Sequence, residues 1–370
     1  MTYSKGLEGV TAAETAISNV EGDIGRLTYR GYQIEDLVHK QCEEVVWLVL
    51  FGELPAASET ARLKSFLLQH RELTEPDLMV LRVLDRDLHP MRLLQGMIPV
   101  LQVPDVEFDG LDQQGSRGLA IVARLPTLIA SYRQLQLDNE LPANDGTTET
   151  YLTRFLGMFT GKPPQPEHVK ILNVIQILQM EHSLNAGTFT SRVASSTLAP
   201  IESVISSAVG ALFGILHGGA DEAALNDAKR TGCPENARVF VEQLLKDKLK
   251  LMGMGHREYR VVDPRSNILK PMAKKLCLGT EFENNFLTLS ALEEEFNLAM
   301  KARGKDVWAN LEFYKGAAYE AIGIPSHYFT SVFAMARSVG WLAHFIESRQ
   351  DNRIIRPKAE YIGLAFREIG

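Results

Sequence analysis

The sequence predicts a mainly α-helical protein that begins with a short β-hairpin. Three observations support this fold class. Apolar residues recur with helical spacing along most of the chain after residue 34, the best strand pattern lies before that point, and glycine and proline cluster between the helical segments. The chain has 370 residues, 45% hydrophobic and 23% charged, which suffices for one large or two medium domains with a substantial core.

The first elements are predicted to be a hairpin followed by a helix. Two short strand-like runs in AISNVEGDIGRLTYRGY, residues 16–32, flank a glycine-containing loop around Glu21–Gly25, which is typical of a β-hairpin. The next apolar run, in EDLVHKQCEEVVWLVLFGELP, ends at Gly52 and Pro55, where we expect a helix to stop.

Further helices are predicted from apolar positions that share one face. In EHVKILNVIQILQMEH the face consists of Ile171, Leu172, Val174, Ile175 and Leu178. LSALEEEFNLAM, residues 289–300, has the same pattern, and residues 329–348 are apolar almost all round, which predicts a buried helix. The chain becomes more charged after HGGADEAAL, and a proline interrupts AIGIPSHY, so residues 219–325 are a candidate inserted domain.

Composition and charge argue against several classes of protein. The net charge of −7 does not suit a nucleic-acid-binding surface, which needs a basic field. No apolar run approaches the roughly 20 residues that span a bilayer, and MTYSKGLEG lacks the pattern of a signal peptide. Three scattered cysteines without CxxC spacing fit a reducing compartment. We therefore expect a cytoplasmic protein that binds neither nucleic acid nor membrane.

The apolar run SSAVGALFGILHGG ends in a histidine, His217. Gly218 and Gly219 follow it, and we expect the helix to stop there. One interpretation of His217 is a core histidine bonded to a backbone carbonyl. The other is a catalytic ring, because burial in apolar surroundings favours neutral imidazole, which can donate a hydrogen bond to a developing enolate.

A second candidate segment is GMGHREYRVVDPRS, residues 253–266. His256 follows a Gly-x-Gly, which lets the backbone approach a ligand closely. An Asp-Pro turn then fixes the direction of Arg265. A fixed guanidinium suits a carboxylate or a phosphate, although a solvated basic loop explains the same residues.

Two more polar residues are unusual for their places in helices. Arg337, in VFAMARSVGW, has no acid one turn away on either side, so it is either paired with another helix or a buried cation for an anionic ligand. His182, in MEHSLNAGTFTSR, lies at a polar helix junction that forms either a ligand wall or a set of caps. The histidines lack a metal-binding spacing such as HExxH, and neither GxGxxG after a strand nor GxxxxGK[ST] occurs. A catalytic metal and those nucleotide folds are therefore not expected.

Together and in order, these motifs resemble the citrate synthase family. The resemblance covers essentially the full length, through GLEGVTAAETAIS, LTYRGYQIEDL, HPM, ARLPTLIASY, HSLNAGTF, GALFGILHGGADEA, GHREYRVVDPR, GIPSHYFTSVFAMARSVGWLAH and IIRPKAEYIG. It implies the citrate synthase fold, with a large helical domain (1–218 and 326–370), a smaller helical domain (219–325) and an active site in the cleft between them, with His217 at the hinge. The chain resembles the shorter, dimeric bacterial members.

The resemblance also implies an acyltransferase of the tricarboxylic acid cycle. Such an enzyme condenses acetyl-CoA with oxaloacetate and hydrolyses the citryl thioester, without a metal or prosthetic group. Glu312 matches the carboxylate base, His217 stabilises the enolate oxygen, and His256 polarises the oxaloacetate carbonyl. The matched ligand-binding positions are His182, Arg265, Arg337 and Arg356 for oxaloacetate, with Arg356 supplied by the neighbouring subunit of a homodimer, and Gly253, Met254, Gly255 and Arg260 for coenzyme A.

The chain departs from the family at the base itself. The family residue is an aspartate, and the extra methylene of Glu312 moves the carboxylate by about 1 Å, a shift that lowers a rate about 100-fold if it is not accommodated. Three explanations are open: a withdrawn backbone, a slow enzyme, or a geometry that is completed only on closure. Asp221 and Glu258 also add negative charge, which weakens anion binding unless Arg257 or a neighbouring lysine pairs with them.

Two other functions stay open. A 2-methylcitrate synthase that prefers propionyl-CoA uses the same catalytic residues, since one methylene in an acyl pocket changes binding by only about 1–3 kcal/mol. Glu312 also fits a homologue with weakened catalysis that serves in assembly or regulation. Against that function, both active-site histidines and all the substrate arginines are present.

Overall fold

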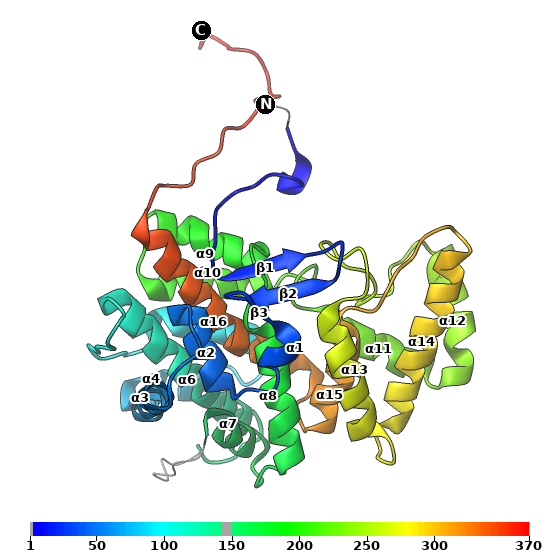
Figure 1. The fold of residues 1–370 in the computed structure, drawn as a ribbon, viewed down its shortest axis with the longest axis horizontal. Coiled ribbons are helices and arrows are strands. Elements are labelled where there is room, and N and C mark those ends of the chain that lie inside the picture. Colours follow the sequence, from blue (N-terminus) through cyan, green and yellow to red (C-terminus); the bar gives the residue numbers. More distant parts are fainter. Residues whose placement is uncertain (1–2, 142–149, 370) are drawn as a thin grey trace.

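The structure, a computed structural model, describes residues 3–141 and 150–369. Positions 1–2, 142–149 and 370, all within the predicted large domain, lie outside the described residues. The fold is mainly helical with one small sheet, as the sequence predicted (Figure 1). None of the described helices combines the length and apolar character needed to cross a membrane.

The sheet has three antiparallel strands in sequence order: β1 (Ser18–Glu21), β2 (Arg26–Tyr29) and β3 (Tyr32–Gln33). Strands β1 and β2 form the predicted hairpin, whereas β3 was not predicted. The hairpin loop packs against a segment far away in the sequence. The carbonyl oxygen of Gly22 accepts a hydrogen bond from the backbone N–H of Arg260 at 2.9 Å, and a Cβ at Gly22 would lie 2.0 Å from the carbonyl oxygen of Glu258. Only glycine permits this contact.

One group of helices is built around α16, which runs through its centre. Ridges of apolar side chains cover almost the whole circumference of α16, and neighbouring helices pack on several of its sides, so it is buried from Phe329 to Phe345 as predicted. The group consists of α1 (Ile34–Leu37), α2 (Cys42–Phe51), α3 (Ala57–His70), α4 (Glu75–Val83), α5 (Pro90–Met97), α6 (Gln113–Gln136), α7 (Tyr151–Thr160), α8 (Pro166–Met180), α9 (Ala186–Ser196), α10 (Ile201–Leu212) and α16 (Phe329–Gln350).

The remaining helices lie together on the other side of the molecule in Figure 1. They are α11 (Ala220–Thr231), α12 (Ala237–Lys246), α13 (Pro264–Cys277) and α14 (Glu283–Lys301). Helix α15 (Leu311–Ala321) packs against α11 and α13, and also touches α8 of the first group. Its position between the two groups brings its N-terminus to the site described below.

Most predicted helical features are confirmed. All five apolar residues predicted on one face of α8 are buried. Helix α2 ends at Gly52, whose φ of 98° is left-handed and closes the helix as expected. In α14, Leu289, Leu292 and Phe296 are buried, while Met300 is half-buried.

The prediction for the end of α10 is wrong. The helix ends at Leu212 rather than at the glycine pair, and residues 213–218 form turns in which the N–H of His217 donates to the carbonyl of Gly214 at 2.8 Å. Gly214 weakens the helix at this point, because glycine is a poor helix former. As a result Ile215 is 74% and Leu216 is 92% exposed, although both belong to the apolar run.

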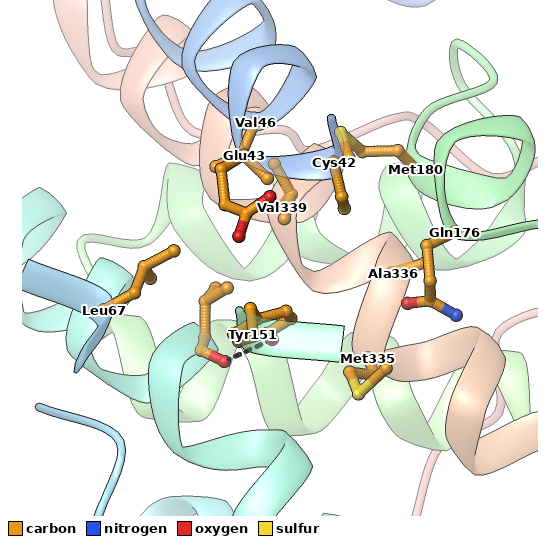
Figure 2. A pocket seen from close by; sticks show the side chains of 11 residues that line it. Cys42, Glu43, Val46, Leu67, Tyr151, Gln176, Met180, Met335, Ala336 and Val339 are labelled. Atoms are coloured by element: carbon orange, nitrogen blue, oxygen red, sulfur yellow. Dashed lines mark hydrogen bonds between the residues drawn. The ribbon is translucent and has the colours of Figure 1, made fainter. Parts of the chain in front are cut away.

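A small enclosed cavity lies inside the first group, between α2, α6, α7, α8 and α16 (Figure 2). Its volume of about 10 Å³ has room for a single water molecule. Its lining is mainly apolar, with the side chains of Glu43 and Gln176 among the polar exceptions. None of the predicted site residues lines this cavity, so the candidate site lies elsewhere.

Candidate active site

The rings of His182, His256 and Tyr259 form the first part of the site. His182 follows α8 and is buried, and its Nε2 lies 3.1 Å from the hydroxyl oxygen of Tyr259. The centroids of the two histidine rings are 5.3 Å apart. Nδ1 of His256 accepts hydrogen bonds from the N–H groups of Glu258 and Tyr259, at 3.0 and 3.3 Å. The neutral ring of His256 therefore carries its proton on Nε2.

Both histidines are held in the neutral form. Burial, followed by the nearby charge of Arg265, lowers the pKa of His256 to about 4. The same two causes hold the pKa of His182 well below its ordinary value. Near pH 7 the Nε2–H of His256 can therefore donate a hydrogen bond to a carbonyl oxygen without carrying a full charge.

Asp263 fixes the position of Arg265. Its carboxylate caps α13 by accepting the backbone N–H of Arg265 at 3.0 Å. It also accepts two hydrogen bonds from the guanidinium, from Nε at 3.0 Å and from Nη2 at 2.8 Å. The N–H of Leu311 donates to the same carboxylate at 3.2 Å, so the N-termini of α13 and α15 are tied together. The sequence predicted a fixed direction for Arg265 from the turn, but the side chain of Asp263 provides it.

Asn310 connects the glycine loop to the candidate base. Gly253 and Gly255 both have a φ of 81°, which is left-handed and favours glycine. Asn310 donates its backbone N–H to the carbonyl of Gly253 at 2.9 Å and its side-chain amide to that of Gly255 at 2.8 Å. Its side-chain oxygen accepts the N–H of Glu312 at 2.9 Å, which caps α15. A change in the loop is therefore transmitted directly to the first turn that carries Glu312.

His217 lies in the turn between α10 and α11. Burial and the charge of Arg337 lower the pKa of His217 to about 4, while the carbonyl of Ala211 and the carboxylate of Glu312 oppose this shift. Its Nδ1 is buried without a hydrogen-bond partner among the described residues. A buried ring nitrogen without a partner is unusual and suits a ring that meets a ligand.

Arg337 is a buried cation, 2% exposed, on α16. Its Nε donates to the carbonyl of Gln179 at 2.6 Å, and its guanidinium carbon lies 4.9 Å from the centroid of the Phe333 ring. Burial lowers the pKa of Arg337, with Glu181 opposing at longer range. Of the two interpretations open from the sequence, an ion pair with another helix is not found within the part of the chain that the structure describes.

Sequence reasoning missed Lys315, which is fully buried on α15. Its ammonium group donates to Oε2 of Glu312 and lies 3.1 Å from Oδ2 of Asp221. Asp221 thus has the neighbouring lysine that its charge requires, whereas Arg257 donates to the carbonyl of Gly6. The sequence held one signal for this contact, a lysine within the apolar run of α15 three residues after Glu312.

Only some of the site residues predicted from the sequence lie close together within a single subunit. The ring of His182 contacts that of His256, which in turn lies next to the guanidinium of Arg265. The charges of Arg337 and Glu312 both influence the pKa of His217, and the charge of Glu312 also influences the pKa of Arg337. Arg260 has an exposed side chain on the loop held by Gly22, and Met254 pairs with Ala309 in an isolated bridge. Arg356 is exposed on the extended C-terminal segment, which leaves the body of the molecule after α16 (Figure 1).

The arrangement offers the carboxylate of Glu312, three neutral histidines and two buried guanidiniums. A carboxylate can remove a proton from carbon, neutral imidazoles can stabilise developing oxyanions, and guanidiniums can bind carboxylates. Within residues 3–141 and 150–369, no three His, Cys, Asp or Glu side chains form a group that could hold a metal ion.

Comparisons with known proteins point to one family. Residues 6–358 match the family model described as citrate synthase, C-terminal domain. A citrate synthase of Acidithiobacillus ferridurans is 36% identical over 98% of this chain and 95% of its own length. A 2-methylcitrate synthase of Shewanella oneidensis is 35% identical over 98% of this chain and 96% of its own. The citrate synthase of Thermoplasma acidophilum, solved as a ternary complex with carboxymethyl coenzyme A and oxaloacetate, has a TM-score of 0.91 at 29% identity and covers 100% of this chain and 98% of its own.

Proposed function

The chain belongs to the citrate synthase family, and on that premise we propose that it is an acyltransferase that condenses acetyl-CoA with oxaloacetate and hydrolyses the product thioester to citrate and CoA. The proposal is supported mainly by one observation. The charge of Glu312 influences two half-buried histidines, His217 and His256, whose pKa values are both lowered to about 4, chiefly by burial. A carboxylate close enough to influence two neutral imidazoles fits a reaction that removes a proton from carbon and stabilises two oxyanions.

The proposed reaction follows from these groups. Glu312 takes a proton from the methyl group of acetyl-CoA, and His217, in the tautomer that carries its proton on the unpaired Nδ1, donates a hydrogen bond to the enolate oxygen that forms. The enolate carbon then attacks the keto carbon of oxaloacetate while the Nε2–H of His256 polarises the keto oxygen, which becomes a hydroxyl with the proton that Glu312 removed from the methyl group. Water finally attacks the citryl thioester carbonyl, the C–S bond breaks, and CoA leaves as the thiol. No step needs a metal or a prosthetic group.

Oxaloacetate carries two carboxylates, and the buried cations suit them. Asp263 occupies Nε and Nη2 of Arg265, which leaves its other amino group for a ligand. Arg337 donates only its Nε among the described contacts, so its terminal amino groups have no protein partner there. We propose that these two residues and His182 bind oxaloacetate within one subunit.

We assign coenzyme A to the loop of Gly253, Met254 and Gly255, with Arg260 meeting a phosphate. The left-handed glycines give the loop its turn, and the side chain of Arg260 is exposed. The loop is bonded through Asn310 to the helix of the base, so bound coenzyme A would lie next to the reacting carbon.

We further propose a homodimer in which Arg356 completes the neighbouring site. The C-terminal segment beyond α16 is extended and exposes apolar side chains, among them Tyr361, Ile362 and Phe366. Such a segment gains stability when a second copy covers it. The division into a large domain (1–218 and 326–370) and a small one (219–325), and a cytoplasmic setting, belong to the same proposal.

A second candidate is 2-methylcitrate synthase. A relative with that name is about as similar to this chain as those named citrate synthase. Its chemistry would use the same residues with propionyl-CoA in place of acetyl-CoA.

The direct test is identification of the product. Purified protein is incubated with acetyl-CoA, oxaloacetate and a metal chelator, and citrate is measured by mass spectrometry. Citrate formation supports the proposal, while its absence with intact oxaloacetate binding, followed by tryptophan fluorescence, favours a homologue with weakened catalysis.

A further inference from the structure

Lys315 is a fully buried lysine whose ammonium group is shared by two carboxylates. It lies on α15 one turn after Glu312, and its Nζ donates to Oε2 of that residue. The same Nζ lies 3.1 Å from Oδ2 of Asp221, in the first turn of α11. The side chains of Lys315 and Asp221 have no exposed surface, whereas 14% of the Glu312 side chain is exposed. Within this triad of Lys315, Asp221 and Glu312, the candidate base Glu312 is therefore the member that reaches solvent.

Two aromatic rings surround the ammonium group. Nζ of Lys315 lies 4.4 Å from the centroid of Phe333 and 5.9 Å from that of Tyr319. The guanidinium of Arg337 faces the same Phe333 ring at 4.9 Å. A cation over a ring face is attracted to it, most strongly where water is excluded. These contacts give the ammonium group further partners beside the two carboxylates.

The charges of the triad balance in a way that suits a base. An ammonium group paired with Glu312 alone would neutralise it, but Asp221 shares the ammonium, so the three groups together keep one negative charge. Burial raises the pKa of Asp221 to about 6, with Lys315 opposing the rise. Lys315 therefore favours the ionised form of Asp221. Removing the lysine would leave two buried carboxylates without a counter-ion.

We propose that Lys315 is a positioning residue for the base, which anchors Oε2 of Glu312 and leaves Oε1 to take the proton, while Asp221 balances the charge. The inference rests on the proposed function and deepens it. Compared with aspartate, glutamate has one more rotatable bond between the backbone and the carboxylate. Anchoring one oxygen removes that freedom, and small displacements of a catalytic group are enough to slow a reaction. This is a fourth way to accommodate glutamate, beside the three that the sequence left open.

The test compares variants that keep the volume of the triad. Lys315→Met combined with Asp221→Asn removes both the ammonium and the carboxylate that would be left unpaired. Lys315→Met alone measures the effect of that unpaired carboxylate. Lys229→Met is the matched control, because Lys229 and Glu320 form an ion pair between the same two helices, α11 and α15, but at a half-exposed place outside the site.

We expect the double variant to fold with nearly unchanged Tm and to keep the KM for oxaloacetate within about twofold, while kcat falls about 10- to 100-fold. A lowered kcat with an unchanged KM marks a positioning role, because the interaction that is lost serves the reaction step and not the binding of oxaloacetate. Lys315→Met alone should lower the Tm more than the double variant.

The charged or titratable groups that act on or near Glu312 are His217, His256, Asp221, Tyr319 and Arg337.

The outcomes separate the two proposals. If wild-type protein releases CoA and the double variant has an unchanged kcat, Lys315 has no positioning role. If Lys229→Met lowers kcat as much as the double variant, the effect is one of helix packing, and the inference is overturned. If wild-type protein releases no CoA, the proposed function fails, and this inference fails with it.

Discussion

Asp263 and Arg265 form a two-point ion pair at the N-terminus of α13, with Nε–Oδ1 and Nη2–Oδ2 distances of 3.0 and 2.8 Å. Burial by itself raises the pKa of the Asp263 carboxyl. The charge and hydrogen bonds of Arg265 outweigh this effect, so the pKa is lowered. The carboxylate also caps α13 and accepts the N–H of Leu311. One residue therefore fixes both Arg265, the proposed oxaloacetate-binding cation, and the helix that carries Glu312, the proposed base.

Replacing Asp263 with Asn should impair both stability and binding. The variant leaves the charge of Arg265 buried without its partner, and breaking a buried pair in this way lowers the free energy of unfolding by about 3 kcal/mol. The KM for oxaloacetate should rise, because the guanidinium is no longer fixed. Urea denaturation and initial rates measure the two effects. Glu242→Gln, which removes an exposed ion pair with Arg238, is the control and should change stability by less than about 0.5 kcal/mol.

Arg337→Met should separate stability from binding. The guanidinium is 2% exposed and no carboxylate among the described residues pairs with it, so the ligand-free protein should be as stable as wild type or more stable. Oxaloacetate affinity should fall about 100-fold or more, since a buried charge contact contributes about 2–5 kcal/mol. Thermal denaturation with and without oxaloacetate checks this, and a variant that still shows the wild-type rise in Tm with ligand would refute the assignment.

Acid should destabilise the protein through its neutral histidines. The pKa values of His182, His217 and His256 are lowered in the fold, to about 4 for the last two, from an ordinary value of 6.5. Between these values the unfolded chain binds more protons, so stability falls as pH decreases from 6.5 to 4 and is fully present above 6.5.

The test of this pH dependence is a urea denaturation series from pH 8 to pH 4, in steps of about half a unit, compared at matched ionic strength. His217→Gln combined with His256→Gln should make the fall between pH 6.5 and 4 shallower. His39→Gln, at an exposed position, should leave the slope as it is. An unchanged slope in the double variant would mean that other groups cause the acid sensitivity.

Arg356 should act in the site of the neighbouring subunit. Arg356→Ala alone should raise the KM for oxaloacetate, and Glu312→Gln alone should lower kcat about 100-fold or more. If the two impaired variants are unfolded together and refolded, each mixed dimer contains one site with an intact base and an intact arginine. Recovery of activity in the mixture supports the contribution in trans, whereas a mixture no more active than its components contradicts it.

Local patterns predicted the parts of the fold that depend on nearby residues. The apolar face of α8, the buried character of α16 and the stop at Gly52 follow from spacing and from glycine geometry. The end of α10 was mispredicted because the apolar run continues past the last helical turn. Ile215 and Leu216 extend the pattern although they lie in a turn, and hydrophobicity alone does not distinguish a buried from an exposed apolar residue.

The site residues were predicted as separate candidates, but not their partners. The ion pair between Lys315 and Asp221 joins two helices far apart in the sequence, and no local pattern encodes such a contact. Asn310 is a similar case, since its cap on α15 is visible in the sequence but its bond to Gly255 is not. These contacts depend on how α11, α13 and α15 pack, which spacing along one helix cannot specify.

The most direct test of the central claim is the release of CoA thiol by purified wild-type protein, measured with oxaloacetate and either acetyl-CoA or propionyl-CoA, without added metal. We predict turnover with acetyl-CoA and a higher kcat/KM for acetyl-CoA than for propionyl-CoA. A clear preference for propionyl-CoA would assign the chain to 2-methylcitrate synthesis with the same mechanism. No release from either thioester would contradict the proposal that Glu312 acts as the base of a citrate synthase.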